Sequence, residues 1–147
     1  MTARAAGKLY TPELLSLATE LAAYPFGEGW PVTATARSRA CGSHLTIGLD
    51  FDAGGRIGRF GLAVSACAVG QASAAIFARS AAGQSAASIA STLEAIERWL
   101  GDTDAALPGW PGFAALTPAR EYPGRHGALM LPWKAAADAL CKGEITS

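Results

Sequence analysis

Residues 43–66 read SHLTIGLDFDAGGRIGRFGLAVSA, and this stretch decides the fold. Leu45, Ile47, Leu49 and Phe51 recur at every second position before the turn-forming residues 52–55. The alternation resumes after that turn, at positions 60, 62, 64 and 66. Because successive side chains of a strand point to opposite faces, two alternating runs joined by a glycine-rich turn predict an antiparallel hairpin with one buried face.

The flanking segments add one strand and several helices. Residues 32–39 alternate small or apolar with polar residues, which predicts a third strand beside the hairpin. Thr11, Pro12 and Glu13 are typical of a helix start. Helices are expected over residues 11–23, 68–82, 85–100 and 132–140, with a loop over 101–111 and a helical turn over 113–116. We predict the α+β class, as a three-stranded antiparallel sheet with helices packed on it, in a single domain spanning residues 1–147.

Composition limits the classes of function. The chain has 147 residues with 12 basic and 12 acidic side chains, so its formal net charge of zero disfavours a nucleic-acid partner or an anionic membrane surface. Arg4 and Lys8 precede an apolar stretch, but acidic residues interrupt it and no cleavage site follows. No run is long enough to span a membrane, and we expect a cytoplasmic protein.

Two of the three cysteines are candidates for a site. Cys41 lies between the first two predicted strands, and Cys67 lies 26 positions later, where the third strand gives way to a helix. Because the open ends of a hairpin lie side by side, both thiols are expected at one edge of the sheet. Gly42 allows close approach of the backbone, and the positive end of the helix after Cys67 favours a thiolate. The pair is either a thiolate site or two ordinary buried cysteines, and the residues alone leave both open.

The histidines add little to this pair. His44 is expected on a solvated strand face, and His126 in a loop before the last helix. Neither belongs to a metal-binding spacing, and the chain has no phosphate-binding loop or nucleophile elbow. No ordered cysteine–histidine–amide set can be assembled for a cysteine hydrolase, so we expect that the protein is not an enzyme.

Several motifs together resemble the U-type iron–sulfur cluster assembly scaffolds, which are IscU, SufU and the N-terminal domain of NifU. Cys41-Gly42-Ser43 is similar to the Cys-Gly-Asp of that family. Residues 66–73, ACAVGQAS, resemble its second cysteine and the following small-residue helix. Residues 122–135, YPGRHGALMLPWKA, follow the SufU-type pattern around the third cysteine, and residues 101–121 resemble the SufU insertion. The resemblance covers roughly residues 9–141 and implies an IscU/SufU-like fold.

The resemblance also implies a reduced ligand set. The family holds a cluster or zinc with three cysteines and an aspartate, helped in some members by a histidine. Ser43 stands at the aspartate position and Ala128 at the third cysteine. The implied metal ligands are therefore Cys41 and Cys67, with Ser43 and His126 beside them. Two thiolates and an imidazole could bind zinc with water in the fourth position, but a [2Fe–2S] cluster usually takes four protein ligands.

Three hypotheses follow. In the first, a divergent scaffold-like protein binds iron, a labile iron–sulfur cluster or zinc through Cys41 and Cys67, with a cysteine desulfurase and cluster-acceptor proteins as partners. In the second, one of these cysteines accepts sulfur as a persulfide. In the third, the fold is a protein-interaction module without a metal site, and its tryptophans supply contact surface or pack in the core. Cys141, beyond the family positions, is expected to pack or to be exposed rather than to bind.

Overall fold

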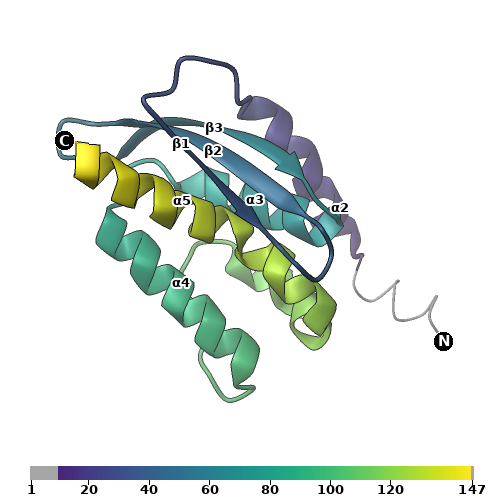
Figure 1. Ribbon diagram of the computed structural model, residues 1–147. Helices are drawn as coiled ribbons and strands as arrows, with labels where there is room; N and C mark the ends of the chain where they lie inside the picture. Colours follow the sequence, from purple (N-terminus) through teal and green to yellow (C-terminus); the bar gives the residue numbers. More distant parts are fainter. Residues whose placement is uncertain (1–9, 147) are drawn as a thin grey trace.

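The expected hairpin is the centre of the structure, a computed structural model that describes residues 10–146 (Figure 1). β2 (His44–Phe51) pairs antiparallel with β3 (Ile57–Ser65). β1 (Val32–Arg37) pairs antiparallel with the other side of β2, so the strand order is β1-β2-β3. The predicted three-stranded antiparallel sheet and the α+β class are confirmed.

Helices precede and follow the sheet. In chain order they are α2 (Pro12–Ala18) and the 3₁₀ helix η1 (Thr19–Ala23) before the sheet, then α3 (Ala68–Ser80), α4 (Ala86–Gly101), the 3₁₀ helices η2 (Phe113–Glu121) and η3 (Pro123–Arg125), and α5 (His126–Thr146). The hydroxyl of Thr11 accepts a hydrogen bond from the Leu14 amide at 3.1 Å, which fixes the start of α2 as the sequence predicts. Ser85 and Ser88 cap α4 reciprocally.

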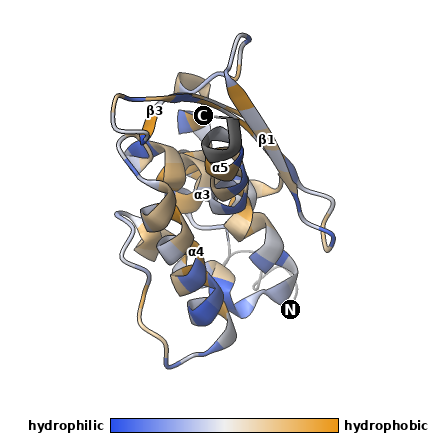
Figure 2. Cartoon of the chain, turned by 60° about the vertical axis from the view of Figure 1, so that its left-hand side comes forward, coloured by the Kyte–Doolittle hydropathy of each residue, from blue (hydrophilic) through white to orange (hydrophobic). Residues whose placement is uncertain are grey.

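One face of the sheet carries the core. Leu45, Ile47 and Leu49 of β2 are fully buried there, as their alternation predicts. α5 packs across β1 and β2, α3 packs on α5 and α2, and α4 packs on α5, so these helices lie on the same side of the sheet (Figures 1 and 2). None of the described helices combines the length and the apolar character needed to cross a bilayer.

Aromatic rings fill the space between the helices. Phe77 of α3 stacks on Trp110 with centroids 5.6 Å apart, and Trp133 of α5 meets Phe77, Trp110 and Phe113 edge to face. Trp99 of α4 meets Phe113 in the same way at 5.2 Å. Because Trp99, Trp110 and Trp133 are all buried, core packing accounts for them and they supply no contact surface.

The fourth tryptophan lies on the opposite face of the sheet. The ring of half-buried Trp30 occupies the space where a side chain at Gly48 would stand. A Cβ atom at Gly61, the partner of Gly48 on β3, would lie 2.8 Å from the same ring. The guanidinium of Arg59 is 5.7 Å from the ring centroid. Two glycines on adjacent strands thus make room for one indole.

The last helix begins earlier than predicted, and the first helix changes type within its predicted span. The last helix begins at His126 rather than Pro132 and continues through Gly143. Pro132 removes one amide donor, but its neighbours Leu131 and Trp133 are buried in the core, and this packing maintains the helix through the proline. The first helix is α-helical only to Ala18 and continues as η1. The helical turn predicted over residues 113–116 is the longer η2, and Arg4 and Lys8 lie outside the described residues.

Candidate functional site

The first cysteine lies in a tight connection between β1 and β2. The Ser38 amide donates to the Ser43 carbonyl at 2.8 Å, and the Gly42 amide donates to the Ser38 carbonyl at 3.0 Å. Gly42 has a φ of 70°, a conformation that favours glycine. These bonds hold half-buried Cys41 at the end of the sheet.

The second cysteine reaches the same place from β3. Ser65, the last residue of β3, pairs with His44, the first residue of β2, and half-buried Cys67 follows as the N-cap residue of α3. A pocket of about 260 Å³ lies at this end of the sheet, lined by Cys41, Gly42, Ser43, Ser65, Ala66, Cys67 and Arg125. The prediction that the open end of the hairpin brings the two thiols together is correct: they share one pocket.

Hydroxyl groups surround the sulfur of Cys41. The Ser43 hydroxyl lies 3.0 Å from the Cys41 Sγ and the Ser38 hydroxyl lies 3.5 Å from it. The hydrogen bond between Cys41 and Ser43, followed by that between Cys41 and Ser38, lowers the pKa of the Cys41 thiol. Partial burial opposes this shift, while the backbone of Ser43 and the positive charge of Arg125 add to it. These contacts favour the thiolate form of Cys41.

The other predicted ligands lie differently. Ser43 lines the pocket, but its buried hydroxyl bonds to the Cys41 sulfur. His126 is half-buried as the first residue of α5 rather than in a loop, and its Nε2 lies 2.7 Å from the Arg120 carbonyl oxygen. His126 is not among the pocket-lining residues. Within residues 10–146, no three His, Cys, Asp or Glu side chains cluster closely enough to hold a metal ion.

Ala128, at the position of the family's third cysteine, lies beside the start of α3. It is fully buried. A Cβ atom built at Gly70 would lie 2.6 Å from the Cβ of Ala66 and 3.4 Å from the Cβ of Ala128. Ala66 lines the pocket, whereas Ala128 is not among the pocket-lining residues.

Arg125 is a pocket residue to which the sequence assigned no role. It belongs to the Tyr-Pro-x-Arg segment and ends η3 just before α5. Its half-buried guanidinium donates to the Tyr10 hydroxyl at 3.3 Å, and within the described chain it has no ion pair with a carboxylate. The sequence feature that could have identified Arg125 as a site residue is its place in that motif, three positions before Ala128. The pocket thus holds one cation and no carboxylate.

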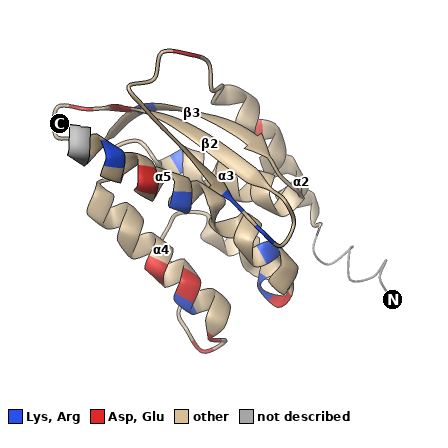
Figure 3. Cartoon of the chain, in the orientation of Figure 1, with Lys and Arg blue, Asp and Glu red and all other residues tan. Residues whose placement is uncertain are grey.

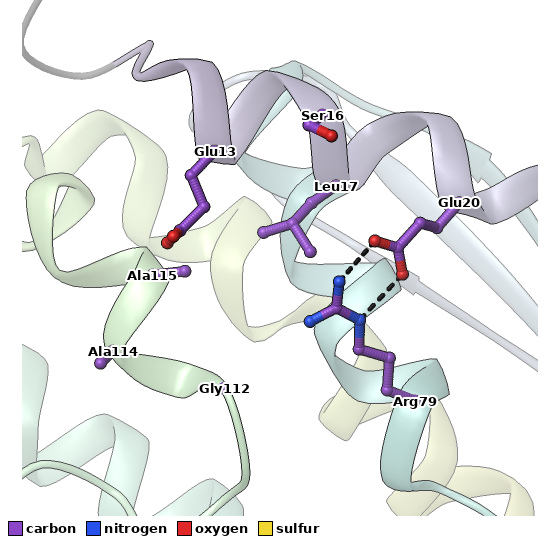
Figure 4. Close-up of a pocket in the computed structure, with 8 residues that line it drawn as sticks. All are labelled: Glu13, Ser16, Leu17, Glu20, Arg79, Gly112, Ala114 and Ala115. Carbon is purple, nitrogen blue, oxygen red and sulfur yellow. Dashed lines mark hydrogen bonds and ion pairs between the residues drawn. The ribbon is translucent and has the colours of Figure 1, made fainter.

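A second pocket, of about 350 Å³, lies between α2, α3 and η2 (Figure 4). Arg79 of α3 pairs there with Glu20 through two bonds, of which the one between Nε and Oε1 measures 2.8 Å. Glu13 extends from α2 toward Ala115. The guanidinium in this pocket is already neutralised, in contrast to Arg125.

Charge is distributed unevenly over the molecule (Figure 3). Acidic side chains gather along α4 and the loop after it, at Glu94, Glu97, Asp102 and Asp104. Arg125 is the charged residue that lines the thiol pocket, and its positive charge acts on Cys41.

Comparisons with known proteins find solved structures of similar fold. No model of a protein family matches the sequence, and no curated protein matches it. The N-terminal part of a nitrogen-fixing NifU-like protein from Brucella abortus superposes with a TM-score of 0.84 at 29% identity, covering 97% of this chain and 99% of that one. A protein from Fervidobacterium islandicum, assigned as an iron–sulfur cluster assembly scaffold of the SUF system, superposes with a TM-score of 0.79 at 19% identity, covering 90% and 96%. In fold, and over nearly its whole length, the chain is similar to these NifU-like and SufU proteins, in agreement with the resemblance of its sequence motifs.

Proposed function

We propose that the protein acts in iron–sulfur cluster assembly and holds iron or a labile cluster, as cargo, through Cys41 and Cys67. The observation that carries this proposal is the shared pocket at the open end of the hairpin, which one thiol lines from each of the two flanking segments. Thiolates are the ligands that iron–sulfur clusters take in proteins. A cysteine desulfurase and cluster-acceptor proteins are the partners that such a role requires.

The donor set does not fit a fully protein-ligated cluster. Such a cluster takes four protein ligands, and the pocket offers two thiols. The Ser43 hydroxyl is bonded to Cys41, and Ala128 has no donor atom. Cargo held by two thiolates is labile, which suits transient loading better than storage. Zinc would meet the same shortage of ligands.

Metal analysis tests this proposal. The full chain is purified anaerobically, loaded with ferrous iron and sulfide, and its iron and sulfide per chain are measured after gel filtration. We expect the Cys41→Ala/Cys67→Ala double variant to retain much less iron than wild type. Cys141→Ala is the matched control, because this exposed cysteine is remote in sequence from both pocket segments. Equal iron in the double variant and wild type would refute the proposal.

A sulfur-acceptor role is the second candidate, and the hydrogen bonds to Cys41 favour it. The thiolate, rather than the thiol, attacks a sulfane sulfur, and the serine hydroxyls stabilise that form of Cys41. In this step the Cys41 thiolate attacks the terminal sulfur of the desulfurase persulfide. A new sulfur–sulfur bond forms on Cys41, and the desulfurase cysteine leaves as a thiolate.

Intact mass spectrometry distinguishes this role from cargo binding. After incubation with a desulfurase and cysteine, the chain is expected to gain the mass of one sulfur atom. The gain should disappear in Cys41→Ala and persist in Cys141→Ala. A gain that persists in Cys41→Ala would assign the sulfur to another cysteine.

A further inference from the structure

The thiol pocket places a cation beside its nucleophiles. The half-buried Arg125 lines it together with Cys41 and Cys67. No carboxylate lines the pocket, and no ion pair joins Arg125 to an acidic residue of the described chain. The guanidinium donates instead to the neutral phenol of Tyr10, at 3.3 Å. Because its charge is not neutralised by these contacts, Arg125 can pair with an anion that enters the pocket.

The other polar groups around the pocket also favour an anion. The hydroxyl of Ser43 lies 3.0 Å from the Cys41 sulfur, and exposed Ser65 contributes a second serine to the lining. The pocket borders the start of α3, whose N-cap residue Cys67 makes no capping hydrogen bond and whose first turn has no acidic residue. The start of a helix attracts negative charge. An anion that approaches Cys41 therefore meets hydrogen-bond donors and positive charge.

The size of the pocket and the chemistry of its thiol restrict the anion further. The volume of about 260 Å³ lies below the ~300–1,000 Å³ that is usual for drug-sized ligands, so a small ion fits this space. A cysteine thiolate attacks sulfur atoms that are bonded to a good leaving group. Thiosulfate combines these properties, because its terminal sulfur is open to attack and its oxygens accept hydrogen bonds from a guanidinium.

We propose that the pocket takes a small anionic sulfur donor of the thiosulfate class, with its oxygens on Arg125 and its terminal sulfur at Cys41. The Cys41 thiol loses its proton to solvent, and the thiolate attacks the terminal sulfur. The bond between the two sulfur atoms of thiosulfate breaks, sulfite leaves with its electron pair, and Cys41 carries a persulfide. No further oxidant or reductant takes part. The step shares its nucleophile with the sulfur-acceptor role, but it requires neither a desulfurase nor a metal ion.

Product formation tests the transfer. The full chain, reduced and then freed of reductant without oxygen, is mixed with thiosulfate and with cyanide, which removes the sulfur of a persulfide as thiocyanate. We expect thiocyanate and sulfite to form in equal amounts, at a rate that saturates with thiosulfate. Cys41→Ala should lower the rate to that of the mixture without protein, whereas the exposed Cys141 can be replaced by alanine without loss. A rate in Cys41→Ala equal to wild type, or none above the protein-free mixture in wild type, would overturn the proposal.

Arginine variants test the partner of the anion. Arg125→Gln should raise the thiosulfate concentration that gives half the maximal rate by about tenfold, which is the usual size of a charge-assisted hydrogen bond. Arg125→Lys keeps the charge and should recover part of this loss. Arg39→Gln removes an exposed charge close to Cys41 in the chain but outside the pocket lining, and should match wild type. An unchanged half-saturating concentration in Arg125→Gln, with a wild-type circular dichroism spectrum, would overturn the assignment of Arg125.

Sulfate and a desulfurase separate this inference from the functions proposed above. Sulfate has the charge of thiosulfate but no terminal sulfur, so it should inhibit the wild-type reaction more than chloride does at equal ionic strength. This difference should vanish in Arg125→Gln, and equal inhibition of wild type by the two salts would overturn the anion site. Sulfur uptake by Cys41 from a desulfurase but not from thiosulfate would overturn this inference alone. Loss of uptake from both donors would overturn the sulfur-acceptor role with it.

Discussion

The hydroxyl of Ser43 lies 3.0 Å from the sulfur of Cys41. The residue at the family's aspartate position thus contacts the first thiol directly. A serine here supplies no negative charge to a metal ion, but its hydrogen bond favours the thiolate form of its neighbour. A serine at this position therefore favours sulfur chemistry at Cys41 over metal ligation.

Removing this hydroxyl should make Cys41 less reactive. In Ser43→Ala the largest contribution to the lowered pKa of Cys41 is lost, so the pKa rises and less thiolate is present at neutral pH. We expect severalfold slower alkylation of Cys41 by iodoacetamide at pH 7, and a reactivity midpoint at higher pH. Peptide mass spectrometry measures the rate for each cysteine.

Ser65→Ala is the matched control for that experiment. Ser65 lines the same pocket, but no hydrogen bond joins it to Cys41. Its removal should leave the alkylation profile of Cys41 unchanged. If the two serine variants slow the reaction equally, a general change in the pocket rather than the Ser43 bond controls this thiol.

Restoring the family residues should strengthen cargo binding. Ser43→Asp places a carboxylate in the pocket, and Ala128→Cys places a thiol beside Ala66 and Gly70. The double variant then has the three cysteines and the aspartate of the family, and should retain more iron and sulfide per chain after gel filtration than wild type.

The control for this double variant has nearly the same shape. Ser43→Asn/Ala128→Ser replaces the carboxylate by an amide and the thiol by a hydroxyl, and should retain no more iron than wild type. A gain in the control as large as that in the test variant would show that the new ligands are not the cause.

The sheet could be predicted from the sequence because alternation and the glycine-rich turn are local signals. The same signals predict that Cys41 and Cys67 lie close together, because the two open ends of a hairpin lie side by side. The start of α5 could not be predicted, because Pro132 is locally a helix-start signal and only the burial of its neighbours shows otherwise. The bond from His126 to the Arg120 carbonyl likewise depends on the path of η2 and η3, which no spacing encodes.

Two core tryptophans should tolerate substitution differently. Trp110 Nε1 donates to the Ile76 carbonyl at 3.0 Å, whereas the buried Trp133 Nε1 has no hydrogen-bond partner among the described residues. Trp110→Phe loses a hydrogen bond, whereas Trp133→Phe loses none and removes a buried donor that has no partner. We expect Trp133→Phe to be less destabilising, by about 1 kcal/mol in the free energy of unfolding by urea. The reverse order would indicate that a buried water satisfies Trp133.

The pair between Glu20 and Arg79 should contribute modestly, in a defined range of pH. The bond from Arg79 lowers the pKa of Glu20 below its usual value of 4.5. Its stabilisation is therefore present above pH 4.5 and is lost as the pH falls through the lower, folded-state value. Because both side chains are partly exposed, a double-mutant cycle of Glu20→Gln and Arg79→Met should give no more than about 1 kcal/mol at pH 7. A coupling that persists unchanged at pH 2 would exclude the ion pair as its source.

Arg125 illustrates what the sequence leaves out of the site. Its motif is visible in the chain, but the absence of an acidic partner for it among residues 10–146 emerges only when η3 is placed against the pocket. Ser38 is similar, since its contact with Cys41 depends on the tight connection between β1 and β2. Both residues reach the pocket from turns, and hydrophobic periodicity does not predict the path of the chain through a turn.

Because the Trp30 ring packs over Gly48 and Gly61, its intrinsic fluorescence reports on that face of the sheet. Three of its four indoles are buried, so their emission changes little while the core remains folded. Trp30 is half-buried on the opposite face of the sheet, so its emission is the one that a change of surroundings on that face would alter. A shift in emission wavelength that disappears in Trp30→Phe would report occupancy of that face without any added label.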